Sequence, residues 1–167
     1  SLFVLDNDKL CESYSDLRLS ETFSLSDELL YTAAKDIAEL FSVPGYINVN
    51  FSDLNEFMRR SGFAIIGFAT SKGVDRFHKA IEAAIQSPSM NNIDLKEAKS
   101  IILYINVSSS EDLSLDEMTI ITDYINDKFD PEVHCLWNIR FDESLESSIR
   151  ITIIATRFTK DAATILA

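Results

Sequence analysis

Short apolar runs alternate along the chain with segments in which apolar residues recur at helical spacing. The apolar runs predict strands at residues 2–5, 63–69, 101–107, 133–141 and 149–155. Helical spacing predicts helices at residues 20–42, 74–86 and 114–128, and a short helix near residue 53. We therefore expect an α/β (α+β) two-layer sandwich, with a mixed sheet of about four strands and packed helices, preceded by a long central helix.

The order of these elements also predicts how they connect. From residue 63 onward the chain reads β-α-β-α-β-β. Strands joined through a helix run parallel and cross over with a right hand, whereas two strands joined by a short loop form an antiparallel hairpin. We expect two right-handed parallel crossovers followed by a hairpin of the last two strands.

Capping residues predict where the helices begin. Ser20 is expected to cap the long helix, and Ser52 or Asp53 the short one. Ser114 and Glu117 have the spacing of a capping box at the start of the 114–128 helix.

The long helix carries two apolar stripes. The first consists of Phe23, Leu30, Ala34, Ile37 and Phe41, and the second of Leu25, Leu29, Ala33 and Leu40. A helix with one face exposed to solvent needs only one apolar stripe, so this helix is expected to be buried on two sides. The downstream sheet covers one side. A segment outside this chain or a second copy would cover the other, and the pattern does not choose between them.

Asp27 lies on the face of the first stripe, four residues after Phe23. An acidic residue near a helix start can simply favour the helix macrodipole. Alternatively, the pair forms a ligand site in which Phe23 stacks on a flat ring and Asp27 accepts its N–H groups. The pattern alone leaves both interpretations open.

The composition limits the possible functions. The chain has 167 residues, 46% of them hydrophobic and 25% charged, as expected for one soluble globular domain. Its net charge of −12 would be repelled by nucleic acids and anionic membranes, so we expect neither as a partner. Gly62 and Gly67 have P-loop spacing, but Phe68-Ala69 follows where a lysine and a hydroxyl residue are required. The chain alone is therefore not a standard nucleotide-binding domain.

The cysteines and histidines predict neither disulfides nor a metal site. Cys11 and Cys135 are isolated thiols, which is typical of the reducing cytosol. His78 and His134 lie far apart in the sequence, and neighbouring His134 and Cys135 would point to opposite faces of a strand. No apolar run approaches the ~20 residues of a membrane span. We expect a cytoplasmic protein.

An ordered series of short motifs spans nearly the whole chain. In order, these are Asn7-Asp8-Lys9-Leu10, residues 23–27, residues 43–53, Ser61-Gly62-Phe63-Ala64, Gly73 with Arg76, residues 83–88, residues 112–117, Trp137, Asp142, Leu145 and residues 149–158. Together they resemble the C-terminal half of the folded region of the FtsZ family, the bacterial tubulin homologues that polymerise into the division ring. The resemblance runs from residue 2 to residue 158.

The resemblance assigns two groups of site residues. Asn7, Phe23 and Asp27 match family positions that contact the guanine base. Asn48, Asn50 and Asp53 match the family's synergy loop, which enters the nucleotide pocket of the next subunit and positions the water that attacks the γ-phosphate of GTP. Phosphoryl transfer depends mostly on such positioning and electrostatics. Asp53 can also be a plain helix cap, and the two roles are compatible.

The sequence departs from the family pattern at three places. Asn50 stands where the family usually has an aspartate, which removes one of two catalytic carboxylates and is expected to slow or abolish turnover. Ser108-Ser109-Ser110 replaces a pair of glycines, and Arg157 replaces a glycine in the last strand. The family's glycine-rich phosphate loop and its C-terminal recruiting peptide do not occur in this sequence.

The resemblance implies a division into four segments. Residues 1–19 would be a remnant strand and turn of a missing nucleotide-binding domain, and residues 20–43 the central helix. Residues 44–158 would form the C-terminal activation domain, and residues 159–167 the start of a flexible linker. Because the chain begins at Ser1, we expect it to be a fragment.

The function implied is that of the C-terminal domain of an FtsZ-like cell-division GTPase. It would provide the polymer interface and the loop that activates hydrolysis in the adjacent subunit. The chain alone is expected to be inactive and to hold no cofactor, whereas the full-length protein would bind GTP with Mg²⁺. Its partners would be FtsZ-type subunits, head to tail, and the missing GTP-binding domain. The alternative is a non-catalytic module that caps or regulates FtsZ-type filaments.

Overall fold

A computed structural model describes residues 2–3, 19–43, 45–47, 49–59, 62–90, 93–109 and 113–158. The strands in this part of the chain form a mixed sheet in the order β1-β2-β5-β3-β4. Their bounds are β1 Leu2–Phe3, β2 Phe63–Lys72, β3 Ala98–Val107, β4 His134–Phe141 and β5 Ser148–Phe158. The helices are α2 Leu19–Ser42, α3 Phe51–Met58, α4 Arg76–Ile85 and α5 Leu115–Lys128, with short 3-10 turns η1 Leu95–Glu97 and η3 Glu143–Leu145.

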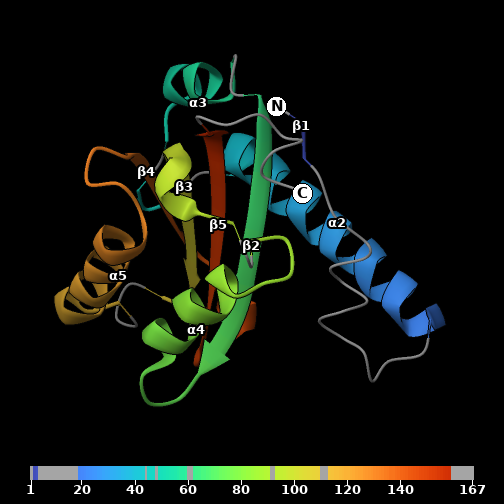
Figure 1. Ribbon diagram of the computed structural model, residues 1–167. Coiled ribbons are helices and arrows are strands. Elements are labelled where there is room, and N and C mark those ends of the chain that lie inside the picture. Colours follow the sequence, from blue (N-terminus) through green and yellow to red (C-terminus); the bar gives the residue numbers. More distant parts are fainter. Residues whose placement is uncertain are drawn as a thin grey trace.

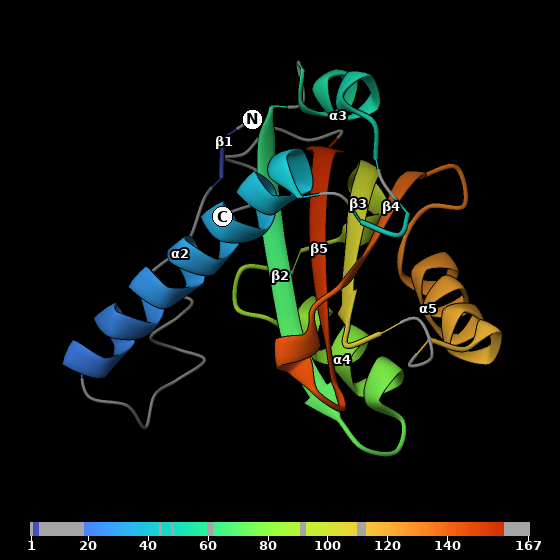
Figure 2. The same ribbon diagram turned by 180° about the vertical axis from the view of Figure 1, so that it is seen from behind.

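Helices cover both faces of the sheet. α4 and α5 pack on one face, while α2 crosses the other face and α3 lies at one end (Figures 1 and 2). Alternate residues of β3 feed the two cores, because successive side chains of a strand point to opposite faces. Ile101 and Leu103 join the cluster under α4 and α5, whereas Ile102 and Tyr104 join Leu54 of α3 in the second cluster. The predicted fold class is confirmed.

The expected hairpin of the last two strands is wrong. β5 lies between β2 and β3 and is antiparallel to both, while β4 pairs in parallel with β3. The chain between β4 and β5 passes the end of β3, where the Asp142 N–H donates to the Val107 carbonyl at 2.8 Å. The two strands take these positions because they differ in how much of each is buried. β5 is buried on both faces through most of its length and occupies the centre, whereas most of β4 is only partly buried and forms an edge.

The helix starts differ from the sequence prediction in two of three cases. The α5 capping box of Ser114 and Glu117 is present as predicted. α3 begins at Phe51 and is capped by Asn50, so Ser52 and Asp53 lie in its first turn. α2 begins at Leu19, which places Ser20 inside the helix, and the residue before it lies outside the described residues.

The two apolar stripes of α2 have different surroundings. From the second stripe, Ala33 is buried. From the first, Ile37 packs against the cluster that contains Leu54, but Leu30 is 50% exposed and Ala34 is also exposed. The N-terminal half of α2 projects past β2, the neighbouring strand (Figure 2). The sheet therefore covers only part of this helix.

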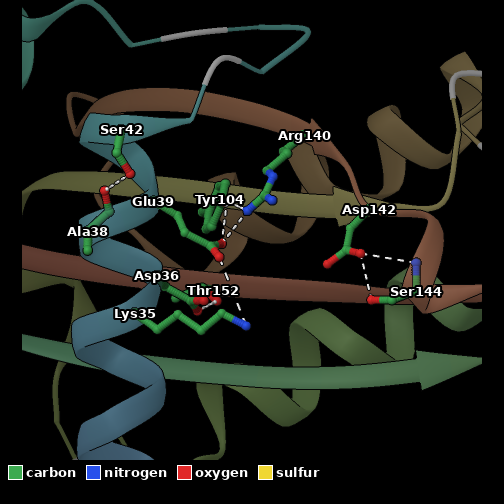
Figure 3. A network of polar contacts seen from close by, with 10 residues as sticks. All are labelled: Lys35, Asp36, Ala38, Glu39, Ser42, Tyr104, Arg140, Asp142, Ser144 and Thr152. Carbon is green, nitrogen blue, oxygen red and sulfur yellow. Dashed lines mark hydrogen bonds and ion pairs between the residues drawn. The ribbon is translucent and has the colours of Figure 1, made fainter.

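Polar side chains join the C-terminal half of α2 to the sheet (Figure 3). Glu39 forms an ion pair with Arg140 of β4 and accepts a hydrogen bond from the Tyr104 hydroxyl at 3.3 Å. The Thr152 hydroxyl of β5 donates to the carboxylate of Asp36 at 2.6 Å. Asp36 is only 1% exposed, and this burial raises the pKa of its carboxyl group above the usual value.

The raised pKa of Asp36 predicts a pH-dependent effect of Asp36→Asn. The folded state binds the Asp36 proton more tightly than the unfolded state, so wild-type stability rises as the pH falls through the folded pKa and is lost as the pH rises. The amide does not titrate. We therefore expect the free energy of unfolding of Asp36→Asn, taken relative to that of wild type, to be higher at pH 7 than at pH 4. Urea unfolding at the two pH values measures it. An equal difference in the free energy of unfolding at both pH values would contradict this.

Candidate functional site: the loop before α3

The segment before α3 is anchored to the edge strand of the sheet. Ile47 forms an isolated antiparallel bridge with Ile139 of β4, in which the Ile139 N–H donates to the Ile47 carbonyl at 3.0 Å. The Tyr46 N–H donates to the Ile139 carbonyl at 2.7 Å, and its ring lies 5.3 Å from that of Phe141. These contacts fix where the chain leaves the sheet edge and turns towards α3.

The other end of the segment is fixed by a reciprocal contact between Asn50 and Asp53. The Asp53 backbone N–H donates to Oδ1 of Asn50 at 2.8 Å, and Nδ2 of Asn50 donates to Oδ2 of Asp53 at 2.7 Å. Both side chains are exposed, whereas Leu54 and Phe57 on the inner face of α3 are buried against the sheet. The Asp53 carboxylate is thus oriented at the helix start and faces solvent.

The remaining predicted site residues lie elsewhere or outside the described part. Asp27 is exposed on the half of α2 that projects beyond the sheet. Phe23 lies four residues earlier in α2, but its side chain, like Asn7 and Asn48 as a whole, is outside the described residues. The 24 residues of α2 span about 36 Å, and α3 lies near the far end from Asp27 (Figure 1). One chain therefore does not bring Asp27 and Asp53 together.

A cavity of about 330 Å³ adjoins Asp53, and the sequence did not predict it. It is lined by Asp53, Glu56, Phe57, His134, Leu136 and Arg157. The lining combines acidic and basic side chains with the apolar side chains of Phe57 and Leu136. Its lining residues come from α3 and from the ends of β4 and β5, which are distant in sequence. The one signal in the sequence that could have indicated this cavity is Arg157, which stands where the family has a glycine.

A second cavity of about 330 Å³ has a mostly apolar lining and includes Tyr46 and Ile47 of the loop. Tyr46, Ile47, Leu113, Ser114, Leu115, Met118, Ile139 and Phe141 line it. Tyr46 is 69% exposed and Leu115 is 86% exposed. Exposed apolar groups gathered in this way are typical of association surfaces.

The environments of Cys135 and His134 bear on whether the described residues could carry nucleophilic or metal chemistry. Burial raises the pKa of the Cys135 thiol to about 12, so it is neutral at physiological pH. His134 is exposed whereas its neighbour Cys135 packs against the core, in line with the opposite faces expected. Within the described residues, no group of three or more His, Cys, Asp or Glu could hold a metal ion. No helix there is long and apolar enough to span a membrane.

The family profile described as "FtsZ family, C-terminal domain" matches residues 62–159, more than half of the chain. The chain belongs to the FtsZ family. It is 34% identical to the mitochondrial division protein fszA of Dictyostelium discoideum, over 93% of this chain and 30% of that protein. It is 33% identical to the cell division protein FtsZ of Methanothermobacter thermautotrophicus, over 92% of this chain and 40% of that protein.

Solved FtsZ structures share the fold. The FtsZ dimer of M. jannaschii superposes with a TM-score of 0.81 at 30% identity, over 93% of this chain and 44% of that one. A TubZ-Bt filament subunit gives a TM-score of 0.75 at 12% identity, over 93% of this chain and 41% of that one, which shows the fold alone. The chain thus spans less than half the length of these FtsZ-family relatives.

Membership of the FtsZ family fixes the architecture but not the source organism. The profile match covers strands β2 to β5 with α4 and α5, and the similarity to FtsZ chains extends through α2 and the loop before α3. The sequence resemblance pointed to a bacterial protein. The relatives include FtsZ proteins from archaea and from the bacterium Porphyromonas gingivalis, and a mitochondrial division protein. The similarity therefore supports a cell-division, tubulin-like protein without assigning it to bacteria.

Proposed function

We propose that this chain provides the activating loop and polymer interface of an FtsZ-type GTPase. Asp53 acts on the nucleotide held by the adjacent subunit. The observation that carries the proposal is the exposed Asn50–Asp53 pair, which lies at the opposite end of α2 from Asp27. A subunit built in this way needs a neighbour to bring Asp53 to a nucleotide that contacts Asp27.

The geometry of Asp53 suits it to orient an attacking water. Its carboxylate accepts one hydrogen bond from the Asn50 amide and points to solvent from the start of a helix whose inner face is buried. A carboxylate held in this way can accept a hydrogen bond from water and draw off its proton as the water attacks a phosphate. Positioning of this kind supplies most of the catalysis in phosphoryl transfer.

The N-terminal half of α2, on which Asp27 is exposed, is proposed to contact the guanine base of GTP. Asp27 offers an exposed carboxylate to the N–H groups of the base, with Phe23 and Asn7 as its proposed partners. This sequence contains no glycine-rich phosphate loop, so another segment would hold the phosphates and Mg²⁺. The exposed Leu30 and Tyr31 near the middle of the helix support contact with such a segment.

Head-to-tail assembly is proposed to use the surface around the loop. The apolar cavity lined by Tyr46, Leu115 and Met118 borders the same segment that carries Asp53. An interface formed there would bury apolar groups while bringing Asp53 against the neighbour. Because the two surfaces of a head-to-tail contact differ, repetition produces an open filament. In a cell, such filaments would form a cytoplasmic division ring.

The isolated chain is expected neither to bind GTP measurably nor to hydrolyse it. The four glycines of the sequence form no phosphate-binding loop, and base contacts alone provide little affinity. Titration calorimetry and phosphate release at high protein concentration, on a chain shown by circular dichroism to be folded, provide the test. Micromolar affinity for GTP would overturn the proposal that another segment holds the phosphates.

Asn50→Asp is expected to raise GTP turnover in an FtsZ-type subunit that carries this chain, by about threefold to tenfold. The aspartate still accepts from the Asp53 N–H and keeps the helix cap. It loses the Nδ2 hydrogen bond to Asp53 but adds a second carboxylate beside the attacking water, and we expect the added carboxylate to have the larger effect. Steady-state phosphate release is the measurement. Asn50→Ala, which loses the cap, is the control and is expected to lower turnover. No increase for Asn50→Asp would show that the missing carboxylate does not limit the reaction.

Asn50 also favours a second candidate, a non-catalytic module that caps FtsZ-type filaments. Its amide occupies one Asp53 oxygen and cannot itself accept a proton. If this is the function, adding the isolated chain at low ratio should shorten FtsZ filaments in light scattering, and Asn50→Asp should leave turnover at background.

A further inference from the structure

Arg157 near the end of β5 has a backbone conformation that is unusual for its residue type. Its φ of 56° lies in the left-handed region, which glycine adopts without strain and arginine rarely adopts. The residues on either side are both tied to Phe63 of β2. The Thr156 hydroxyl donates to the Phe63 carbonyl at 2.9 Å, and the Phe158 ring stacks on the Phe63 ring with centroids 4.7 Å apart. The surrounding contacts thus hold the strained residue in place.

The side chain of Arg157 reaches the helix that carries Asp53. Its Nη2 donates a hydrogen bond to the backbone carbonyl of Glu56. Glu56 lies in the last turn of α3, where the carbonyl groups lack partners within the helix and form the negative end of the macrodipole. A guanidinium is well suited to this place, because it supplies both a positive charge and an N–H donor.

We propose that Arg157 is a positioning residue for Asp53; this inference rests on the function proposed above. α3 has only eight residues, and among its described side chains Leu54 and Phe57 are the ones buried against the sheet. Apolar contacts alone leave a short helix some freedom to tilt and rotate. Asn50 fixes the start of α3 and Arg157 fixes its end, so the Asp53 carboxylate keeps one direction relative to the sheet.

The shared cavity strengthens this assignment. Asp53, Glu56 and Arg157 line the same 330 Å³ space, so the guanidinium lies on the side of α3 from which Asp53 projects. Loss of the hydrogen bond from Arg157 to the Glu56 carbonyl would therefore change the position of the Asp53 carboxylate directly. Small displacements of a group that positions a reactant are enough to slow the reaction.

The test compares Arg157→Gly, Arg157→Lys and Arg59→Ala in an FtsZ-type subunit that carries this chain. Glycine adopts the left-handed backbone conformation without strain, so Arg157→Gly is not expected to unfold although it removes the hydrogen bond to Glu56. Lysine keeps a cationic donor. Arg59→Ala removes an equal charge at the C-cap of the same helix and serves as the matched control. The readouts are hydrogen exchange of the α3 amides, GTP affinity of the single subunit, and turnover at saturating subunit concentration.

For Arg157→Gly we expect exchange in α3 to rise by about threefold to tenfold and turnover to fall by a similar factor. GTP affinity and the midpoint of thermal unfolding should remain near wild type. Arg157→Lys should recover most of the turnover, and Arg59→Ala should match wild type. Unchanged exchange and turnover in Arg157→Gly, or an equal loss in Arg59→Ala, would overturn the inference.

Asp53→Ala, measured in parallel, separates this inference from the proposed function. If Asp53→Ala turns over GTP at the wild-type rate, the proposed function fails, and with it the catalytic part of the Arg157 role. If Asp53→Ala is inactive while Arg157→Gly is normal in both readouts, only the Arg157 inference fails.

Discussion

Asp53→Ala is expected to lower GTP turnover by about 10²–10⁴-fold in an FtsZ-type subunit that carries this chain, the usual effect of losing a general base. GTP affinity of the single subunit should stay unchanged, because α3, which carries Asp53, lies near the C-terminal end of α2, whereas Asp27 lies in its N-terminal half (Figure 1). The helix itself should persist, since Asn50 still accepts from the backbone N–H at position 53. Phosphate release and calorimetry on the same preparation measure the two effects.

Ser52→Ala is the matched control for this prediction. Ser52 is exposed in the same turn of α3, but Asn50 caps the helix in its place. The Ser52 variant should therefore retain wild-type turnover. If Asp53→Ala also hydrolysed GTP at the wild-type rate, Asp53 would contribute only to the start of the helix, and the catalytic interpretation would be wrong.

Gly67→Ala is expected to destabilise the fold by about 3 kcal/mol or more, at the upper end of overpacking effects. A Cβ at position 67 of β2 would overlap the backbone carbonyl oxygen of Ala84 and the Sδ atom of Met90, and would lie 2.7 Å from Oγ of Ser87. Ala84 belongs to α4, which is packed on the sheet and cannot move away freely. The midpoint of thermal unfolding should fall by roughly 6–12 °C, measured by circular dichroism.

Gly73→Ala separates this steric effect from backbone strain. Gly73 has a φ of +82° but nothing within 4 Å of an added Cβ, so alanine there should cost only about 1 kcal/mol. If the two variants lost equal stability, close packing of β2 against α4 would not be the reason for the glycine at position 67.

Local signals in the sequence predicted the elements well. The capping box of Ser114 and Glu117 lies within one helical turn, and it marks the start of α5 in the structure. The cap of α3 was harder to predict, because Asn50, Ser52 and Asp53 can all accept a backbone N–H. The choice depends on which residue has an extended backbone, and that residue is Asn50.

Features that depend on distant parts of the chain were not predictable in the same way. The central position of β5 follows from its burial on both faces, which pairs it with β2 and β3 rather than with its neighbour in sequence. The resemblance to the FtsZ family identified Asn50 and Asp53, but the hydrogen bond between their side chains is visible only in the structure. The same holds for Arg157, whose departure from a family glycine became informative once its left-handed φ and its contact with α3 were known.

The central claim, that Asp53 acts on a neighbouring subunit, is tested most directly by complementation. One variant, Asp27→Ala, keeps the loop but is impaired in the proposed base contact. The other, Asp53→Ala, keeps the nucleotide pocket but lacks the carboxylate. Mixed at equal concentration, the two should hydrolyse GTP clearly faster than the sum of the separate proteins, because intact loops meet intact pockets at mixed junctions. A rate equal to that sum would contradict action between subunits.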